Sequence, residues 1–392
     1  MPAARPVDLL VIGGGPAGHH AARAFREAGG AGTVALVSAD TSAPYHRPPL
    51  SKDYLRGEAD EQDLPIEGDS WYSEHGIDLV LNTSIDHLDA AARVALGASG
   101  ERWQYRSCVV ATGSVPLTPD LPGADHPGVH YLRSAADGQR LRERAAGAGS
   151  AVVIGSGFIG CEAAASLAMR GLTVTLVTDE QLPQQDRLGY WAGERIKEWL
   201  AEVGVRFRGA VELVSIAGGH RVSLSDGAEL DADLVLCAMG IRPRSDLARR
   251  AGLPVQGGRV PVDAAMHSAV PGLFFAGDVA LARNDSAGRR LIVEHWGEAE
   301  RMGSIAGTVA AGRRARWTEV PGFWSEIGTH TLKYAAWGDG YDQAVPVPER
   351  DGVFTVWYGR DDRVVGVLTH DADPDYEQGA SMVKRGDSVP AG

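Results

Sequence analysis

Two glycine-rich segments are the first candidates for chemistry in this 392-residue sequence. Residues 13–18, GGGPAG, fit the pattern G-x-G-x-x-G and follow the apolar run Leu9–Ile12. In a strand–turn–helix unit of this kind, the first glycine allows a tight turn and the second lets the backbone approach a pyrophosphate. The third glycine allows the helix, expected here over residues 21–28, to pack closely on the strand. The helix N-terminus adds free N–H groups and partial positive charge, so we predict dinucleotide binding, although such turns also occur without a ligand. The predicted contacts of this first finger are Gly13, Gly15, Pro16, Ala17 and Gly18.

A second copy of the unit begins at Ala151 with AVVIGSGFIG, and a helix and the strand Thr173–Val177 follow it. In each copy an acid stands after the second strand, at the offset that suits the ribose hydroxyls of a dinucleotide. The acid of the first copy is Asp40, for which a loop residue without a ligand is the alternative. The duplication is the strongest signal in the sequence and predicts two dinucleotide sites. The predicted contacts of the second finger are Gly155, Gly157, Phe158, Ile159, Gly160 and Asp179.

Two further segments carry residues suited to a cofactor. In PYHRPPLSK, residues 44–52, two prolines favour a rigid extended loop that bears the cations Arg47 and Lys52. These cations lie within reach of the phosphate-binding end, and a solvated basic loop is the alternative. The run SCVVATG, residues 107–113, predicts a strand that ends in small residues which a ligand can approach closely. The candidates there are Ala111, Thr112 and Gly113.

The composition indicates a globular protein of two or three domains, with 44% hydrophobic and 23% charged residues. The net charge of −13 argues against nonspecific binding to nucleic acid or to an anionic membrane surface. No run of about 18 apolar residues predicts a membrane span. Cys108, Cys161 and Cys237 lie far apart without metal-ligand spacing, so we expect no metal site. The N-terminal MPAARPVD lacks the pattern of a signal peptide, and we expect a reducing, cytoplasmic setting.

The motif set as a whole resembles a family. In order, GGGPAG, PYHRPPLSK, VVATG, VVIGSGFIGCE, GIRP, FFAGD and EHW resemble the flavoproteins with two dinucleotide-binding domains. The set is most similar to the NADH-dependent ferredoxin and rubredoxin reductases of oxygenase systems, which are related to putidaredoxin reductase and apoptosis-inducing factor. The resemblance implies an α/β fold with two Rossmann-like dinucleotide-binding domains and a small α+β C-terminal domain. The implied segments are 1–118 and 244–317 for an FAD domain, 119–243 for an NAD(P)H domain, and 318–392 for the C-terminal domain.

The resemblance also implies roles for single residues. The first finger would hold FAD and the second NAD(P)H, with Arg47 and Lys52 as cations on the flavin side. The implied catalytic pair is Lys52 with Glu162, beside flavin N5 and the nicotinamide. Asp278 would accept hydrogen bonds from the ribityl hydroxyls, and Trp296 would flank the isoalloxazine. The remaining implied cofactor contacts are Gly240, Gly277, Glu294 and His295, the last two at the start of a helix whose positive end faces the flavin.

The chemistry expected of the bound flavin follows from the cysteines. Residues 40–60 contain none, so we expect no thiol relay against the flavin and expect electrons to leave the flavin directly. The resemblance implies a ferredoxin- or rubredoxin-type carrier as the acceptor and a monomer or homodimer as the assembly. The alternatives are direct reduction of a small molecule, quinone or oxygen, and a redox-sensing protein like apoptosis-inducing factor. An acidic carrier would require a cationic patch, and the candidates, which a solvated cluster would explain equally well, are Arg289, Arg290, Arg313, Arg314 and Arg316.

The choice of coenzyme depends on the end of the strand Thr173–Val177. Thr178 stands where many relatives have glutamate, but Asp179 and Glu180 follow at once, and no arginine occurs before Arg187. Acids at this place bind a ribose diol and repel a 2′-phosphate. We therefore expect NADH in preference to NADPH.

Overall fold

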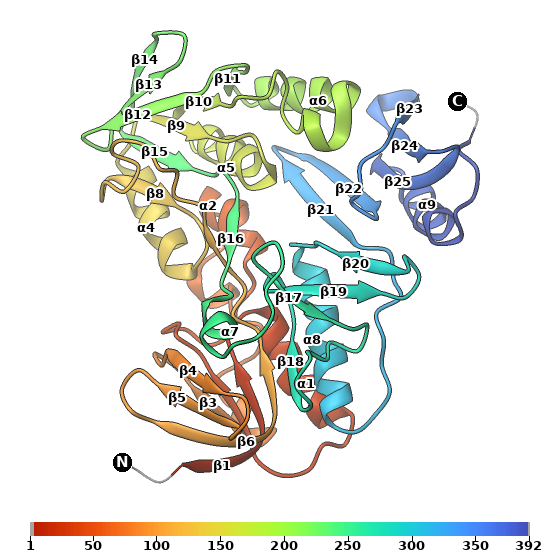
Figure 1. Ribbon diagram of the computed structural model, residues 1–392. Helices are drawn as coiled ribbons and strands as arrows, with labels where there is room; N and C mark the ends of the chain where they lie inside the picture. The colour runs from red at the N-terminus through yellow and green to blue at the C-terminus, as the bar shows by residue number, and fades with distance from the viewer. Residues whose placement is uncertain (1–3, 391–392) are drawn as a thin grey trace. The chain divides into compact units, whose positions relative to one another are not determined.

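The computed structural model describes residues 4–390, and the chain divides into two compact units. Unit 1 comprises the residues up to His46, Pro65–Val115 and Arg242–Phe323, and unit 2 comprises Arg47–Leu64, Pro116–Ile241 and the chain from Trp324 onward (Figure 1). Where the chain passes between the units, strands β7 (Ser114–Pro116) and β16 (Ile241–Pro243) pair with each other. The α/β class is confirmed, whereas the four segment bounds stay a prediction.

Unit 1 is built on a seven-stranded sheet of order β3-β2-β1-β6-β5-β4, in which β18 also pairs with β6. The strands are β1 (Arg5–Ile12), β2 (Val34–Val37), β3 (Ile77–Val80), β4 (Ile85–Asp89), β5 (Val94–Gly97), β6 (Arg102–Val110) and β18 (Leu273–Phe275). Strand β1 runs parallel to β2 and β6, with Leu9 opposite Val34 and Leu10 opposite Cys108. Strand β18 is also parallel to β6. Because parallel strands end at one edge of a sheet, the residues that follow β1, β6 and β18 gather there.

Four helices and a small sheet complete the described elements of unit 1. They are α1 (Pro16–Glu27), α3 (Trp71–Glu74), α7 (Asp246–Arg250), α8 (Trp296–Ala310), and the strands β17 (Val260–Val262), β19 (Ala280–Asn284) and β20 (Arg289–Leu291). Helix α1 begins at Pro16, five residues before the predicted start at Ala21. Proline suits the first helical position because the amide there has no partner within the helix.

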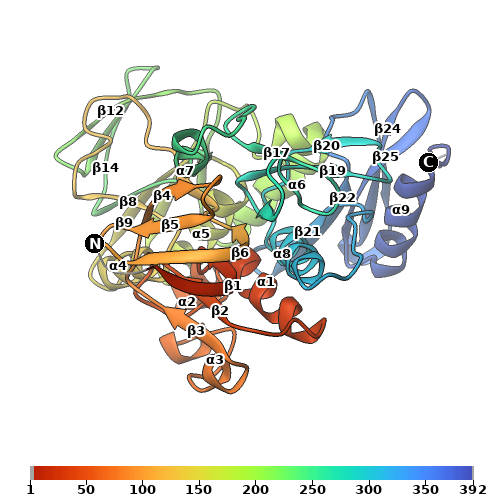
Figure 2. The ribbon, with the colours of Figure 1, turned by 60° about the horizontal axis from the view of Figure 1, so that its bottom comes forward.

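Helices α1 and α8 lie against each other at very short range (Figures 1 and 2). A Cβ atom added at Gly303 would lie 2.1 Å from the carbonyl oxygen of Ala17, and one at Gly307 would lie 2.0 Å from that of Ala21. Such distances are possible only for glycine, since the obstacle is backbone. The alanines of α1 and the glycines of α8 therefore set the separation of the helix that carries the first finger from its neighbour.

Gly307→Ala is expected to destabilise the protein by about 2 kcal/mol. The new methyl group must push the two backbones apart, which costs about 1–3 kcal/mol in a packed core and outweighs the helix propensity that alanine gains. Gly297→Ala in the same helix is the matched control, because nothing lies within 4 Å of its Cβ position. Urea unfolding of both variants checks the prediction, and an equal stability of the two would contradict it.

Unit 2 contains a five-stranded parallel sheet of order β11-β10-β9-β15-β8. Its strands are β8 (Val129–Tyr131), β9 (Ser150–Ile154), β10 (Thr173–Val177), β11 (Arg206–Arg208) and β15 (Leu234–Cys237). The helices that accompany them are α4 (Ala135–Ala146), α5 (Phe158–Met169) and α6 (Gln185–Glu202), and an antiparallel sheet is formed by β12 (Leu213–Ala217), β13 (Arg221–Leu224) and β14 (Glu229–Asp231). The second finger lies between β9 and α5, as the first lies between β1 and α1.

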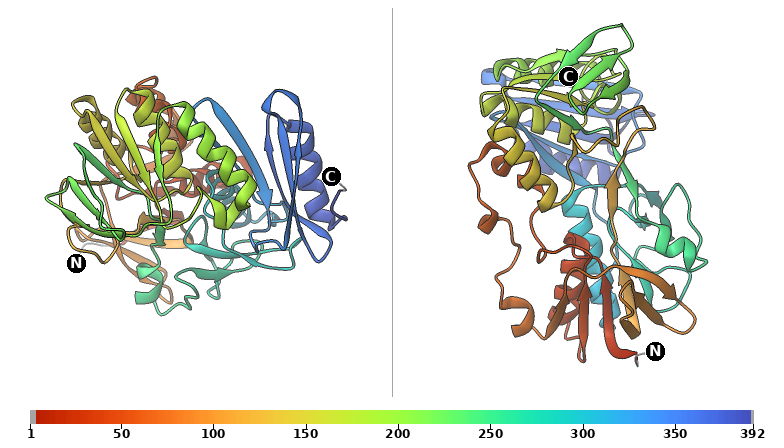
Figure 3. Two further views of the ribbon diagram at one scale, coloured as in Figure 1. Left: turned by 90° about the horizontal axis from the view of Figure 1, so that it is seen from above. Right: turned by 90° about the vertical axis from the view of Figure 1, so that its left-hand side faces the viewer.

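The C-terminal part of unit 2 is a five-stranded sheet with a helix on it (Figure 3). The elements are β21 (Gly322–Ile327), β22 (His330–Ala336), β23 (Gln343–Pro348), the 3-10 turn η3 (Arg350–Gly352), β24 (Phe354–Arg360), β25 (Arg363–His370) and α9 (Asp373–Arg385). Their order is β21-β22-β25-β24-β23, and α9 packs on β22 and β25. This confirms the small α+β C-terminal domain that the resemblance implied.

The segment with two prolines forms turns rather than an extended loop. Its elements are the 3-10 turns η1 (Pro48–Ser51) and η2 (Glu61–Asp63), with the short helix α2 (Asp53–Arg56) between them. The prediction of an extended conformation was wrong at η1, because both prolines occupy its first two positions, where no N–H group is required. Within residues 4–390, none of the helices has both the length and the apolar character needed to cross a membrane.

Candidate active site

The first finger has the geometry that close approach to a phosphate requires. Gly13 has a φ of +119°, and a Cβ atom there would lie 2.2 Å from the carbonyl oxygen of Ala111. A Cβ atom at Gly18 would lie 1.8 Å from the carbonyl oxygen of Gly13. Only glycine, which has no Cβ atom, lets helix α1 pack this closely on the turn. Helix α1 is N-capped by Gly15, which has no side chain to occupy the amides of the first turn. These amides are the donors that a pyrophosphate group needs, so the finger fits a dinucleotide.

The second finger repeats this geometry in unit 2. Gly155 has a φ of +100°, and its Cβ position lies 2.4 Å from the carbonyl oxygen of Ala238. The Cβ position of Gly160 lies 1.9 Å from the oxygen of Gly155, and Gly157 is the N-cap of α5. Ile159, in the first turn of α5, keeps an exposed apolar side chain. Each unit therefore contains one complete finger.

The predicted residues at the sheet edge of unit 1 are held by hydrogen bonds. Ser114 donates to a carboxylate oxygen of Asp278 over 2.6 Å, and both side chains are buried. The hydroxyl of Thr112 donates to the carbonyl oxygen of Arg244 over 2.8 Å. The carboxylate of Asp40 accepts the hydroxyl of Tyr45 over 2.8 Å. Sequence reasoning missed Ser114, although it directly follows the VVATG motif.

The EHW motif lies at the beginning of α8, which starts at Trp296 with His295 as its N-cap. The carboxylate of Glu294 pairs with the guanidinium of Arg259. This ion pair was not predicted. It involves the side chain of Glu294, which the resemblance had implied as a cofactor contact. The ring of His46 lies 5.8 Å from that of Trp296. The helix N-terminus and the indole thus lie next to each other in unit 1.

Lys52 and Glu162 form a buried ion pair in unit 2. The ammonium Nζ of Lys52 lies 2.7 Å from Oε2 of Glu162, and both side chains are less than a tenth exposed. The same oxygen accepts the hydroxyl of Ser51 over 2.6 Å. A buried charged group is costly unless it is paired and hydrogen-bonded, and this arrangement supplies both kinds of contact. The implied pair therefore forms, while its place beside a flavin stays a prediction.

One face of α5 holds the segment that carries Lys52. Four residues after Glu162, the hydroxyl of Ser166 donates to the carbonyl oxygen of Ser51 over 2.7 Å. Four residues further, Arg170 donates to the carbonyl oxygen of Leu55 over 2.8 Å. The i, i+4, i+8 spacing places all three side chains on one helix face. That spacing was a signal in the sequence that the motif comparison did not use.

The loop after β10 is fixed by Glu180. Its carboxylate accepts the hydroxyl of Ser156, in the second finger, over 2.9 Å, and the backbone amides of Gln184 and Asp186 over 3.1 and 3.0 Å. The hydroxyl of Ser156 also lies 3.0 Å from that of Thr178. Asp179, by contrast, is exposed. The two neighbouring acids therefore have different roles: Glu180 binds the loop to the second finger, whereas Asp179 faces solvent.

Arg187 lies at the second finger as well. Its guanidinium carbon is 5.6 Å from the centroid of the Phe158 ring. In the sequence, Arg187 stood out only as the first arginine after Asp179 and Glu180. Its contact with Phe158 could not be predicted, because the two residues are 29 positions apart. A fixed positive charge there is suited to the phosphates of a dinucleotide.

The thiols and the arginines named as candidates differ in exposure. Cys108, Cys161 and Cys237 are all buried, and burial raises the pKa of each thiol. Of the arginines named for a cationic patch, Arg316 pairs with Asp285, and the others remain candidates.

His19, on α1, is fully buried with Nδ1 3.1 Å from the hydroxyl of Tyr72, and burial lowers its pKa to about 3. An unfolded histidine titrates near 6.5, so acid protonates the unfolded chain first. The stabilisation is therefore complete above about pH 6.5 and is lost as the pH falls toward 3. We expect His19 to account for about 2 kcal/mol of lost stability between about pH 6.5 and 5. Urea unfolding of wild type and His19→Gln at both pH values tests this, with His20→Gln as control. An identical pH slope in wild type and His19→Gln would contradict it.

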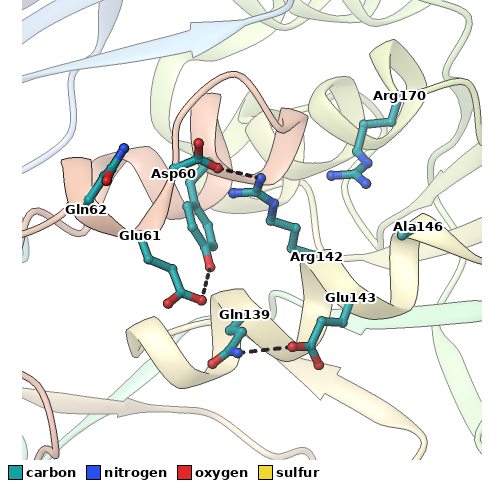
Figure 4. Close-up of a pocket in the computed structure, with 9 residues that line it drawn as sticks. Asp60, Glu61, Gln62, Gln139, Arg142, Glu143, Ala146 and Arg170 are labelled. Carbon is teal, nitrogen blue, oxygen red and sulfur yellow. Dashed lines mark hydrogen bonds and ion pairs between the residues drawn. The ribbon is translucent and has the colours of Figure 1, made fainter.

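A hollow of about 580 Å³ lies between α2, η2 and α4 in unit 2 (Figure 4). Two of its polar contacts are internal: Arg142 pairs with Asp60 at 3.0 Å, and the amide of Gln139 donates to Glu143 over 3.0 Å. Arg142 also stacks on Tyr54. None of the predicted site residues lines it. It is therefore separate from the fingers and from the Lys52–Glu162 pair.

The fold and the two fingers define a pyridine nucleotide oxidoreductase with two dinucleotide-binding units. The sequence comparisons give the family: residues 7–303 match the model of the pyridine nucleotide-disulphide oxidoreductases, and residues 322–392 match that of the reductase C-terminal domain. The chain belongs to this family.

Several relatives are similar over most of their length. The chain is 33% identical to a ferredoxin–NAD(P)+ reductase of Sphingomonas sp, over 96% of this chain and 92% of that protein. It is 32% identical to the rubredoxin–NAD+ reductase of Pseudomonas putida, over 86% and 88%. Among solved structures, a ferredoxin reductase of Rhodopseudomonas palustris matches with a TM-score of 0.92 and 29% identity, over 97% and 96% of the two chains. The recognition made from the motifs is confirmed.

Proposed function

We propose that the protein is an FAD-dependent oxidoreductase that takes a hydride from NADH and passes the electrons to a ferredoxin- or rubredoxin-type carrier. The observation that carries this is the presence of one tight finger in each unit, with a buried Lys52–Glu162 pair on the helix of the second finger. The similar proteins named above are reductases of ferredoxin or rubredoxin, which supports the same acceptor class here.

In this proposal unit 1 holds FAD. The amides at the start of α1 bind its pyrophosphate and Asp40 its ribose, while residues 111–113 and Gly277 leave room for the ligand. Asp278, oriented by Ser114, accepts hydrogen bonds from the ribityl chain. Trp296 flanks the ring, and the start of α8 stabilises negative charge at its pyrimidine edge. FAD, when bound, accepts the two electrons of a hydride and releases them singly.

Unit 2 holds NADH. The amides at the start of α5 bind the pyrophosphate, Arg187 adds a positive charge, and Ile159 and Gly240 leave space at the nicotinamide side. Asp179 binds the ribose diol and repels a 2′-phosphate, as Glu180 holds the loop in place. Lys52 and Glu162 fix the charges at the point of hydride transfer. The buried thiols take no part, so the electrons go to an external carrier.

The carrier would dock through positive charge on this acidic protein, for which the arginines at 289, 290, 313, 314 and 316 are the candidates. Cytoplasmic location is part of the same proposal, since the three thiols are free.

Anaerobic titration of the purified protein with NADH tests the core of the proposal. We expect a yellow protein whose visible absorbance bleaches, and kcat/KM higher for NADH than for NADPH. Reduction of cytochrome c should then depend on added ferredoxin and weaken with salt. A protein that takes up no FAD would overturn the proposal. A salt-independent activity with oxygen or quinone would overturn the carrier alone.

A further inference from the structure

The C-terminal sheet contributes a side chain to the Lys52–Glu162 pair. Ser325, in β21, is fully buried and donates its hydroxyl to Oε1 of Glu162 over 2.6 Å. The other carboxylate oxygen, Oε2, accepts the bonds from Ser51 and Lys52. Glu162 is therefore held at both oxygens by two chain segments, residues 51–52 and β21, that lie far apart in the sequence.

The bonds at the two carboxylate oxygens of Glu162 have different consequences. Hydrogen bonds to a carboxylate are short and strong, and in a buried site each one restricts the rotation of the acid. Without the bond at Oε1, the carboxylate can turn about its last torsion and move Oε2 away from the ammonium of Lys52. The bond from Ser325 thus acts on the position of Lys52 through Glu162 alone, while Lys52 also donates to the carbonyl oxygen of Pro48 over 3.3 Å.

Packing alone does not require a hydroxyl at this position. Ser325 shares the buried face of β21 with Ile327, where an apolar residue is normal. A buried hydroxyl is costly unless it is bonded, and the bond of Ser325 goes to the ion pair. The hydroxyl of Ser325 is therefore explained by its hydrogen bond to Glu162.

We propose that Ser325 is a positioning residue of the hydride-transfer site, so that the C-terminal domain completes that site. The inference rests on the proposed function, in which Lys52 and Glu162 lie where NADH meets the flavin. Ser51 performs the same task at the other oxygen from the segment that carries Lys52.

The test compares holoenzymes of wild type, Ser325→Ala, Ser325→Cys and Ser51→Ala. Thr369→Val is the matched control: Thr369 is a buried residue of the same sheet whose hydroxyl has no hydrogen-bond partner. Anaerobic stopped-flow reduction by NADH gives the limiting rate and its half-saturation, and thermal unfolding and NAD+ titration are measured alongside. We expect Ser325→Ala to lower the limiting rate about tenfold with little change in NAD+ affinity. Ser325→Cys, which keeps a weak donor, should lie between, and Thr369→Val should match wild type.

The outcomes separate the two claims. A wild-type rate in folded Ser325→Ala overturns the inference, as does an equal slowing in Ser325→Ala and Thr369→Val. Should Ser325→Ala fail to fold, a wild-type rate in Ser51→Ala also overturns it, because that variant loosens the same carboxylate from another segment. If wild type itself binds no flavin or is not bleached by NADH, the proposed function fails, and the inference falls with it.

Discussion

Lys52→Met is expected to slow reduction by NADH about a hundredfold and to destabilise unit 2 by about 3 kcal/mol. The substitution leaves the buried carboxylate of Glu162 with two hydroxyl donors but no counter-charge, which is the costly way to break a buried ion pair. It also removes a fixed positive charge from the proposed site of hydride transfer, where one such group is worth about 10²–10³ in rate. Stopped-flow reduction and urea unfolding measure the two effects separately.

The double variant Lys52→Met with Glu162→Gln distinguishes stability from catalysis. It removes both charges, so we expect most of the stability to return while the reduction rate stays low. Lys333→Met is the control, because Lys333 pairs with Asp373 at an exposed site of the same unit, where a salt bridge contributes at most about 1 kcal/mol. Recovery of the rate together with the stability in the double variant would show that the pair has only a structural role.

The fingers could be predicted from the sequence because their chemistry is local. At Gly13, Gly18, Gly155 and Gly160 a backbone oxygen lies about 2 Å from the Cβ position, and Gly13 and Gly155 also have positive φ. Only glycine fits at such positions, so the contacts can be predicted from the residue type. Strands β1 and β9 followed from the apolar runs before each finger. The family resemblance then supplied Asp278 and the Lys52–Glu162 pair, which spacing alone does not connect.

The groups that hold these residues could not be predicted in this way. Ser325 lies 163 residues from Glu162, and Ser114 lies 164 residues from Asp278. A serine is common in any loop or strand, so its type gives no sign of a distant carboxylate. The ion pair of Glu294 with Arg259 was hidden for the same reason, since only the folded chain brings the two together. The prolines at 48 and 49 led to the wrong prediction of an extended loop at η1, because a 3-10 turn accepts proline at its first two positions.

Gly13→Ala and Gly155→Ala are expected to abolish different steps, and this assigns the cofactors to the fingers. The methyl group would lie 2.2 Å from a backbone oxygen at Gly13, where φ is +119°, and 2.4 Å from one at Gly155, where φ is +100°. In each variant the turn must then shift away from this oxygen, and the backbone can no longer approach a pyrophosphate in the same way. We expect Gly13→Ala to be purified without flavin. Gly155→Ala should keep its yellow colour but not bleach with NADH at concentrations that saturate wild type.

The opposite ends of the same helices provide the controls. Gly29 and Gly171 also have positive φ, +82° and +96°, but nothing lies within 4 Å of their Cβ positions. Alanine there costs about 1–2 kcal/mol of backbone strain without closing a finger. Gly29→Ala should therefore keep its flavin, and Gly171→Ala should still be reduced by NADH. A loss of flavin in Gly155→Ala with retention in Gly13→Ala would reverse the assignment. Equal losses in each variant and its control would mean that strain in the helix, rather than access of the phosphate to the turn, limits binding.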